Sequence, residues 1–309
     1  MHVGAGAGER SGELVVVLRR ERGRVGEDDL HRRKPRLAPL LVRTWNLFHG
    51  NAKPPERTAF LEEMVRLAAA DRPDVLCLQE VPAWALDRLS DWSGMSAVGA
   101  VAARPTLGPL PSTAELGRVL TSLNHGLLRS AFAGQANAVL VGGGLRIRDA
   151  ESIVLNPRRF RRAQARRLGL DLVARLGWAK ERRVCQAVRV AAGDGSTLVV
   201  GNLHATSYDA DQRLPDAELL RAAWFVDAVA TPGEPVVLCG DFNVTAARSR
   251  TLADLAGPEW GFSAAGAAGI DHVLVRGAEA GPEETWPPER RRLDGRLLSD
   301  HAPVEVRLA

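Results

Sequence analysis

Nine short apolar runs, most of them rich in β-branched residues, constrain the fold of this chain more than any other feature. Each run is four to eight residues long, and Gly, Pro, Asn or Asp stands at many of their ends, which is the pattern of buried β-strands. We therefore predict strands at residues 40–45, 75–78, 138–141, 152–155, 184–191, 197–203, 236–239, 272–275 and 304–308.

Two segments between these strands have the spacing of amphipathic helices, residues 56–70 and 216–230. The apolar positions are Phe60, Met64, Leu67 and Ala68 in the first, and Leu219, Ala223, Val226 and Ala230 in the second. Helices scattered irregularly among strands that often follow one another do not fit a repeating βαβ barrel. We predict an α/β fold with two packed mixed β-sheets flanked by helices, a four-layer α/β/β/α sandwich.

The first 37 residues differ from the rest of the chain. They are Gly-rich and then densely charged with mixed signs, without a sustained apolar period. We predict a disordered extension, or a translation start placed too early, followed by one domain over residues 38–309. The hydrophobic content of 45% in 309 residues is enough for a sizeable core.

The cysteines and the apolar run lengths bear on the cellular environment. Cys77, Cys185 and Cys239 are an odd number and each lies in a predicted strand, so we expect buried free thiols rather than disulfides or a zinc cluster. No run approaches the roughly 18 apolar residues of a membrane span. The early apolar stretch at 14–18 is too short for the core of a signal peptide. We expect a monomer in the cytoplasm.

Basic residues favour a polyanionic partner. Lys and Arg number 41 against 37 Asp and Glu. Residues 157–183 hold nine arginines, partly at helical spacing, which makes this stretch a candidate clamp for a nucleic-acid backbone. A solvated helix face is the alternative interpretation. No interleaved aromatics accompany the arginines, so base stacking on single strands is not indicated.

Polar residues gather at the ends of the predicted strands. Five of these residues follow a predicted strand closely and three precede one: Asn46, Glu80, His204, Asp241 and Asn243 follow, and Asp271, Asp300 and His301 precede. Carboxylate, amide and imidazole groups delivered from one end of a sheet core are the ingredients of a metal-assisted phosphoryl-transfer site.

Six motifs, TWNLFHG, LQE, NLH, GDFN, IDHVLV and SDHAPV, occur in an order that resembles the endonuclease/exonuclease/phosphatase family. Together they span residues 44 to 304. Each is weak alone, but six in order are a strong signal. The resemblance, which extends to the pancreatic-type deoxyribonuclease, implies a divalent-metal-dependent hydrolase of phosphoester bonds with Mg²⁺ or Mn²⁺ as cofactor.

Three residues are predicted metal ligands. Glu80 is a hard oxygen donor of the kind that Mg²⁺ and Mn²⁺ prefer, and it looks like the principal ligand of the family. Asn46 could complete the metal shell or hold the Glu80 carboxylate, with a turn cap as the alternative. Asp300 could ligate the metal or assist the chemistry of its neighbour His301.

Asp241 and Asn243 are predicted catalytic residues. They stand two apart, so in an extended backbone both side chains face the same way and can meet one phosphate. Asp241 is placed to orient or deprotonate the attacking water, and Asn243 to donate to a phosphoryl oxygen. An ordinary turn after a buried strand is the alternative.

Two histidines are predicted to act in the site. His301 can stabilise charge on a phosphate oxygen or move a proton near neutral pH. His204 would be oriented by Asp271 through a ring nitrogen, as the resemblance implies. We interpret the other histidines considered, His49, His125 and His272, as core residues, with a core hydrogen bond for His272. Asn137 is a looser candidate for phosphate contact, against turn capping.

The leading interpretation is hydrolysis of a phosphodiester in DNA or RNA. The alternative is a phosphatase, or a phospholipid or phosphoinositide phosphodiesterase, which would use the same site with a specificity set by residues 82–136 and 156–183. The residue two after Asn46 is not the acidic one that the abasic-site repair branch places there, which weakens a repair assignment. An inactive binding module predicts the loss of a site residue, but all eight are present.

Overall fold

A computed structural model describes residues 39–55, 57, 59–107, 110–123, 133–208, 210–266 and 269–309. The predicted extension over residues 1–37 lies outside these residues, as does His125. The described residues form one compact unit.

A six-stranded sheet carries the first part of the site, with strand order β13–β16–β1–β3–β7–β4. Its strands are β13 (Glu284–Thr285), β16 (Val304–Leu308), β1 (Leu40–Asn46), β3 (Val75–Val81), β7 (Gln135–Val141) and β4 (Ser96–Ala103). β1 and β3 run parallel and the other neighbours antiparallel, so the sheet is mixed.

A five-stranded sheet carries the second part, with strand order β12–β11–β10–β9–β8. Its strands are β12 (Asp271–Arg276), β11 (Val236–Asp241), β10 (Thr197–His204), β9 (Val184–Ala191) and β8 (Arg146–Val154). β10 and β11 run parallel and the other pairs antiparallel, so this sheet is mixed as well.

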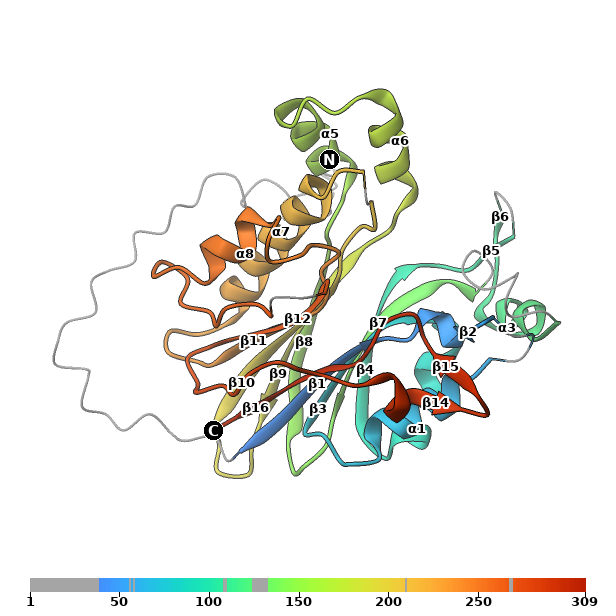
Figure 1. The fold of residues 1–309 in the computed structure, drawn as a ribbon, viewed down its shortest axis with the longest axis horizontal. Helices are drawn as coiled ribbons and strands as arrows, with labels where there is room; N and C mark the ends of the chain where they lie inside the picture. The colour runs from blue at the N-terminus through green and yellow to red at the C-terminus, as the bar shows by residue number, and fades with distance from the viewer. Residues whose placement is uncertain are drawn as a thin grey trace, which may run out of the picture. The chain divides into compact units, whose positions relative to one another are not determined.

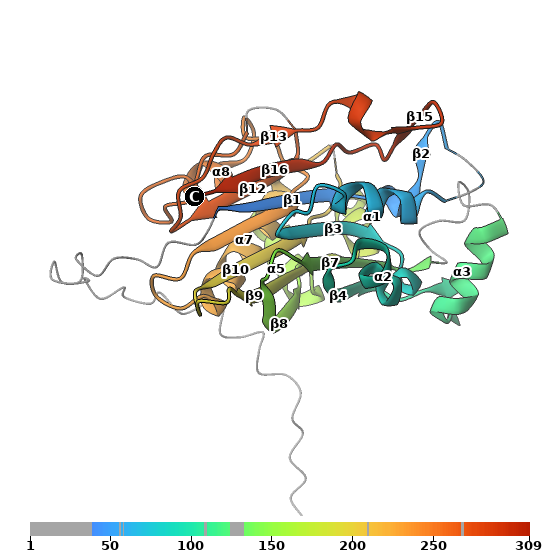
Figure 2. The ribbon, with the colours of Figure 1, turned by 90° about the horizontal axis from the view of Figure 1, so that it is seen from below.

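The two sheets pack face to face with helices on the outside, which confirms the predicted four-layer α/β/β/α sandwich (Figures 1 and 2). α1 (Leu61–Ala69), the 3-10 helix η4 (Ala83–Arg88) and α2 (Leu89–Ser93) cover the six-stranded sheet. α7 (Arg213–Val229) and α8 (Arg250–Leu255) cover the five-stranded sheet.

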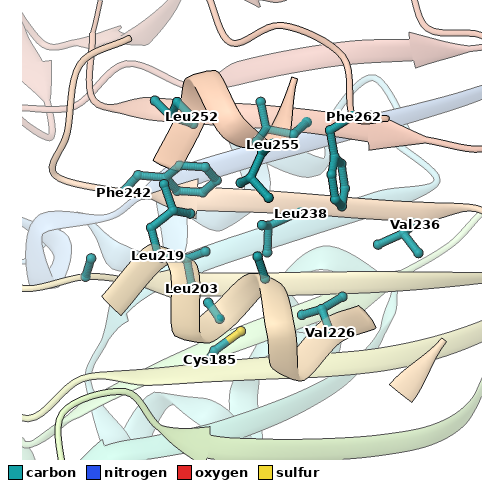
Figure 3. Close-up of a cluster of buried hydrophobic side chains, with 14 of the residues drawn as sticks. Cys185, Leu203, Leu219, Val226, Val236, Leu238, Phe242, Leu252, Leu255 and Phe262 are labelled. Atoms are coloured by element: carbon teal, nitrogen blue, oxygen red, sulfur yellow. The ribbon is translucent and has the colours of Figure 1, made fainter. Parts of the chain in front are cut away.

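Three apolar layers hold the sandwich together. Between the sheets lies a cluster built largely from valines, to which Cys77 and Cys239 also belong. Over the five-stranded sheet, Leu219 and Val226 of α7 pack with strand residues such as Leu238 (Figure 3). A third cluster joins α1 to the six-stranded sheet. Burial of roughly 1.5–3 kcal/mol per large apolar side chain makes these layers the main source of stability.

Shorter elements surround the end of the sandwich where β1 finishes. β2 (Ala52–Lys53), β15 (Arg296–Leu298) and β14 (Arg292–Leu293) form a small sheet next to the 3-10 helices η3 (Phe48–Gly50) and η5 (Pro288–Arg291). β5 (Thr106–Leu107) and β6 (Leu110–Pro111) form a hairpin before α3 (Ala114–Leu123). α5 (Arg158–Arg167) and α6 (Leu172–Lys180) follow β8.

All nine predicted strands are present, β9 and β16 with the predicted bounds. The predicted helix at 56–70 begins only at Leu61, and that at 216–230 begins earlier, at Arg213. Pro215 fits in the first turn because the backbone there needs no N–H donor. β4 was not predicted, because its sequence SAVGAVAA has low β-propensity.

The cysteine prediction is confirmed, since all three cysteines are buried free thiols. Within the described residues, no helix is both long and apolar enough to cross a membrane.

Candidate active site

Three predicted site residues lie in one row across the five-stranded sheet. His204, the last residue of β10, stands opposite Asp241, the last residue of β11. Asp241 in turn stands opposite Asp271, the first residue of the antiparallel strand β12. Because the parallel strands end together and the antiparallel strand begins there, the three side chains are delivered to the same edge.

The six-stranded sheet delivers its residues to the same end. Asn46 closes β1 opposite Gln79 of β3, and Glu80 follows Gln79. The register between β3 and β7 shifts between Leu78 and Val81, and Glu80 has φ +53°. A bulge of this kind re-aims a side chain at the cost of local backbone strain, so the conformation of Glu80 is set by the sheet around it.

The carboxylate of Asp241 is the hydrogen-bonding centre of the site and is buried. Its Oδ2 accepts a 2.9 Å hydrogen bond from Nδ2 of Asn46, and its Oδ1 accepts one of 3.1 Å from the backbone N–H of Asn243. Oδ1 of Asn46 accepts from the N–H of Phe48. Asn46 therefore holds the carboxylate of Asp241 across the two sheets, and not the carboxylate of Glu80.

Asp271 pairs with His301 and not with His204, which corrects the orienting role expected from the sequence. Its Oδ2 lies 2.7 Å from Nδ1 of His301, which stands in the loop before β16. Nε2 of His301 lies 3.8 Å from Oδ2 of Asp241 and 4.0 Å from Oδ1 of Asp300. Asp271 and His301 stand in separate motifs of the sequence, and the packing of the two sheets against each other brings them together.

His204 is held in one tautomer by its neighbours. Nε2 of Gln135 lies 2.9 Å and a guanidinium nitrogen of Arg183 lies 3.2 Å from its Nδ1. Both neighbours can only donate, so Nδ1 is the acceptor and the proton is on Nε2. That N–H faces Oδ2 of Asp241 at 3.3 Å and Oε1 of Glu80 at 3.8 Å.

The two histidines are shifted in opposite directions. Burial, and next the charge of Arg183, hold the pKa of His204 well below its ordinary value of 6.5. Burial also lowers the pKa of His301, but the hydrogen bond and charge of Asp271, with the charges of Asp241 and Asp300, outweigh it and raise that pKa to about 10. The site thus pairs a neutral imidazole with a cationic one at neutral pH.

The same surroundings make Asp241 an unusual carboxyl group. Burial, and next the charge of Asp271, raise the pKa of Asp241 to about 7. His301 and the Asn46 hydrogen bond act in the opposite direction. A carboxyl group with a pKa near neutrality can release or take up a proton at physiological pH.

The remaining predicted residues lie around this centre. Asn243 has φ +52°, so the extended alternation assumed for it does not hold, and its Nδ2 donates to the carbonyl of Ala205. Asn137 is buried between the sheets, where its Nδ2 donates to the carbonyl of Val184, and its Oδ1 has no hydrogen-bond partner among the described residues. Asp300 lies at the rim, 4.0 Å from Nζ of Lys53.

A polar seam lies between the sheets beneath the site. Asn202, two residues before His204, donates from Nδ2 to the carbonyls of Leu78 and Ala138 at 3.1 and 2.9 Å. Its Oδ1 accepts from Nε2 of Gln79 at 2.7 Å. The amide of Asn202 therefore fixes β10 against the bulged strand that carries Glu80.

Several residues of the site were not predicted to act there. His49, interpreted as a core residue, has its Nε2 3.4 Å from Oε2 of Glu80. Arg183 was counted only as part of the arginine stretch, and Gln135 was not selected. The position of His49 in TWNLFHG, three residues after Asn46, was the one available signal. The core interpretation of His272 is confirmed, since its Nε2 lies 3.1 Å from the carbonyl of Val244.

The donor set suits a hard divalent cation. Among the described residues, Asp241, Asp271 and His301 are the group of acidic and imidazole side chains whose candidate ligand atoms all lie within 4.8 Å of one another. Because the raised pKa keeps His301 protonated, the carboxylate oxygens of this group are the donors available to a cation. Oδ1 of Asp271 is buried without a hydrogen-bond partner there. A buried carboxylate oxygen that lacks a donor is stabilised by a nearby cation.

Comparison with known proteins shows the family to which the chain belongs. The model of the endonuclease/exonuclease/phosphatase family matches residues 44–301. The chain belongs to this family. The endonuclease/exonuclease/phosphatase name covers nucleases and phosphatases, which hydrolyse phosphoester bonds. A comparison with curated protein sequences gives no match.

Solved structures of the endonuclease/exonuclease/phosphatase family share the fold. The catalytic domain of human nocturnin, solved with a sulfate anion, has a TM-score of 0.59 and 15% identity, over 90% of this chain and 95% of the other. An endonuclease/exonuclease/phosphatase from Bacteroides vulgatus has the same TM-score and identity, over 88% and 99%. Humanized D. rerio TDP2 has a TM-score of 0.55 and 15% identity, over 88% and 99%.

Proposed function

We propose that this protein is a divalent-metal-dependent hydrolase of phosphodiester bonds, with DNA or RNA as its substrate. The observation that carries the proposal is the contact of the His301–Asp271 pair with Asp241 at the edge where both sheets end. A carboxyl group with a pKa near 7 can accept a proton from water. A cationic imidazole beside it can stabilise charge on a phosphate.

Glu80, Asn46 and Asp300 are the proposed ligands of Mg²⁺ or Mn²⁺. Their oxygen atoms are the type of donor that these ions prefer. The unpartnered Oδ1 of Asp271 is a further oxygen of this kind. When bound, the cation supplies positive charge to the scissile phosphate.

Asp241 is the proposed general base. Its Oδ1 and Oδ2 are held by the Asn243 backbone and by Asn46, so the carboxylate cannot rotate freely. With a pKa of about 7, it is partly ionised at neutral pH and can accept the proton of an attacking water.

His301 is the proposed cationic donor to the phosphate. Its Nδ1–H is engaged by Asp271, which leaves the Nε2–H directed toward the carboxylates of Asp241 and Asp300. A preformed cation in a partly buried site stabilises the charge that develops on phosphoryl oxygens. His204, as the neutral Nε2–H tautomer, donates in the same direction. Asn243 and Asn137 remain proposed contacts of the phosphate.

Hydrolysis of a minimal phosphodiester tests this reaction type. We expect bis(4-nitrophenyl) phosphate to be hydrolysed in Mg²⁺ or Mn²⁺ and not in EDTA. Asp241→Asn should lower the rate at least 100-fold, the lower range for loss of an acid–base group. Asp254→Asn, an exposed carboxylate on α8, is the matched control and should keep the rate.

Two outcomes would change the proposal. If the metal-loaded protein hydrolyses neither the diester nor 4-nitrophenyl phosphate, the proposed chemistry is wrong. If it hydrolyses only this monoester, the phosphatase alternative replaces the phosphodiesterase.

A further inference from the structure

The arginine stretch forms a helical hairpin at the site end of the five-stranded sheet. β8 ends at Val154, which pairs with Val184 at the start of β9, and the intervening residues make α5 and α6. Cys185 of β9 lies opposite Leu203, the neighbour of His204. The hairpin α5–α6 therefore leaves the sheet beside the candidate active site (Figure 1).

Buried polar contacts fasten the hairpin to the site. Trp178 of α6 donates from Nε1 to the carboxylate of Glu218 on α7. The same carboxylate accepts from the backbone N–H of Thr206 at 2.7 Å and from its Oγ1 at 2.8 Å. Thr206 stands two residues after His204. Because Trp178 and Glu218 are fully buried, the base of the hairpin has a fixed position relative to His204.

Cationic side chains lead from the site along the base of the hairpin. Arg183 is buried, forms an ion pair with Glu181 and contacts His204, and the exposed Arg182 precedes it. Arg161 donates to the carbonyl of Asn156, and the side chain of Asn156 accepts from the backbone N–H of Arg183 at 3.4 Å, so the start of α5 lies against residues 182–183. Burial and the charges of Arg182 and Arg158 lower the pKa of Arg161, while the charge of Glu218 acts in the opposite direction. Arg158 and Arg182 form no ion pair within the part of the chain that the structure describes. Such a cluster gains from an anion with several charges.

We propose that this basic row, defined as Arg158, Arg161 and Arg182, binds the phosphates of a nucleic acid next to the scissile bond. The inference rests on the proposed phosphodiesterase function. It adds the position of the nucleic-acid backbone that flanks the scissile bond. A polymer offers successive phosphates to the row, whereas a small phosphoester occupies only the site. The row should therefore favour nucleic acids over small phosphoesters, without reading their sequence.

An anionic lipid surface is the competing partner. Leu172, Val173 and Leu176 of α6 are exposed by 69%, 72% and 56%, and apolar side chains near basic ones are typical of membrane-surface helices. Leu172 and Val173, however, begin α6 at the turn of the hairpin, away from its base. The arginines of the row lie at the base, where α5 begins and where α6 returns to β9. The position beside His204 favours the nucleic acid.

Binding of a fluorescein-labelled DNA duplex in EDTA, followed by anisotropy over a range of KCl, tests the proposal on the full chain. The variant Arg158→Gln/Arg182→Gln should raise the Kd about tenfold or more near 0.1 M salt and reduce the salt slope by about 1.8, because about 0.9 is lost for each phosphate contact. Arg146→Gln/Arg307→Gln removes the same charge from exposed positions at the other end of the sheets and should bind like the unchanged protein.

Equal Kd and salt slope in the two variants, with an unchanged melting temperature, would overturn the proposal. A row variant that binds DNA normally but loses binding to phosphatidylglycerol vesicles would also overturn it, in favour of the lipid surface. Hydrolysis of bis(4-nitrophenyl) phosphate separates the two claims. DNA binding that depends on the row, without diester hydrolysis, supports binding by the row and contradicts the proposed function. Diester hydrolysis without row-dependent binding supports the proposed function and contradicts binding by the row.

Discussion

Oδ2 of Asp271 lies 2.7 Å from Nδ1 of His301, and this contact joins the first residue of β12 to the loop before β16. The two strands belong to different sheets. The pair therefore depends on the correct packing of the sandwich, and it fixes both the charge and the direction of the imidazole that we propose as the donor to phosphate.

Replacing Asp271 should lower the pKa of His301. In metal-free protein, we expect His301 to stay protonated up to a pKa of about 10, because the hydrogen bond and charge of Asp271 are the largest influences that raise it. Asp271→Asn should bring this pKa down by several units and lower kcat by about 100-fold or more. NMR titration of the histidine ring nitrogens measures the first effect. An unchanged pKa of His301 in Asp271→Asn would contradict the assigned pairing.

Asp241 should make the metal-free protein less stable as the pH rises. Its folded pKa of about 7 lies above its ordinary value of 3.8, so its contribution to the free energy of unfolding is complete below about pH 4 and is lost as the pH rises toward 7. The loss amounts to at most about 1.4 kcal/mol per pH unit. Asp241→Asn should therefore gain stability relative to the unchanged protein between pH 4 and pH 7.

Urea denaturation in EDTA at several pH values measures this difference. The comparison between the two proteins cancels the contributions of other carboxylates, such as Asp71, whose pKa is lowered to about 2, chiefly by its hydrogen bond to Arg43. A difference in stability that does not change from pH 4 to pH 7 would show that Asp241 has an ordinary pKa.

Glu80 should be required for stabilisation by the cation. A ligand that binds only the folded protein raises its melting temperature, and the rise grows with the logarithm of the ligand concentration relative to its Kd. We expect Mg²⁺ or Mn²⁺ to raise the melting temperature of the unchanged protein and of the control Glu279→Gln, but not of Glu80→Gln. Thermal denaturation across a metal titration measures this. An equal rise in Glu80→Gln would remove Glu80 from the metal site.

Asn202 should support both the fold and the position of Glu80. Asn202→Ala would remove a buried partner from the carbonyls of Leu78 and Ala138, and from the amide of Gln79, which keeps its hydrogen bond to Oγ1 of Thr44. At about 1–3 kcal/mol for each unsatisfied group, we expect a loss of about 3 kcal/mol or more in the free energy of unfolding. Chemical denaturation measures it. A loss below about 1 kcal/mol would mean that the seam does not join the sheets as described.

Much of the fold could be predicted from local patterns. β9 was placed correctly because most of its eight residues, VCQAVRVA, are apolar. β16 was placed correctly because apolar residues alternate with charged ones in VEVRL. β4 was missed because alanine and glycine have low β-propensity. The strand is stabilised by its pairing with β7, which its own sequence does not indicate. The family resemblance is confirmed by the match over residues 44–301. The monomeric state and cytoplasmic location stay predictions.

The candidate site could be predicted in its residue types but not in its pairings. The eight residues selected from the motifs lie at or around one end of the sandwich, because strand ends determine where such residues gather. The partner of Asp271 depends on how the two sheets pack against each other, which no local pattern contains. The backbone of Glu80 and Asn243, both with positive φ, likewise follows from the packing around them and defeats an argument from strand alternation.

The central claim, that Asp241 and His301 act together on a nucleic-acid phosphodiester, is tested most directly by nicking of supercoiled plasmid in Mg²⁺, in Mn²⁺ and in EDTA. We expect nicking in at least one of the two metals, no nicking in EDTA, and loss of nicking in both Asp241→Ala and His301→Ala. Plasmid left intact by the folded, metal-loaded protein would contradict the account. So would plasmid that the two variants nick as fast as the unchanged protein does.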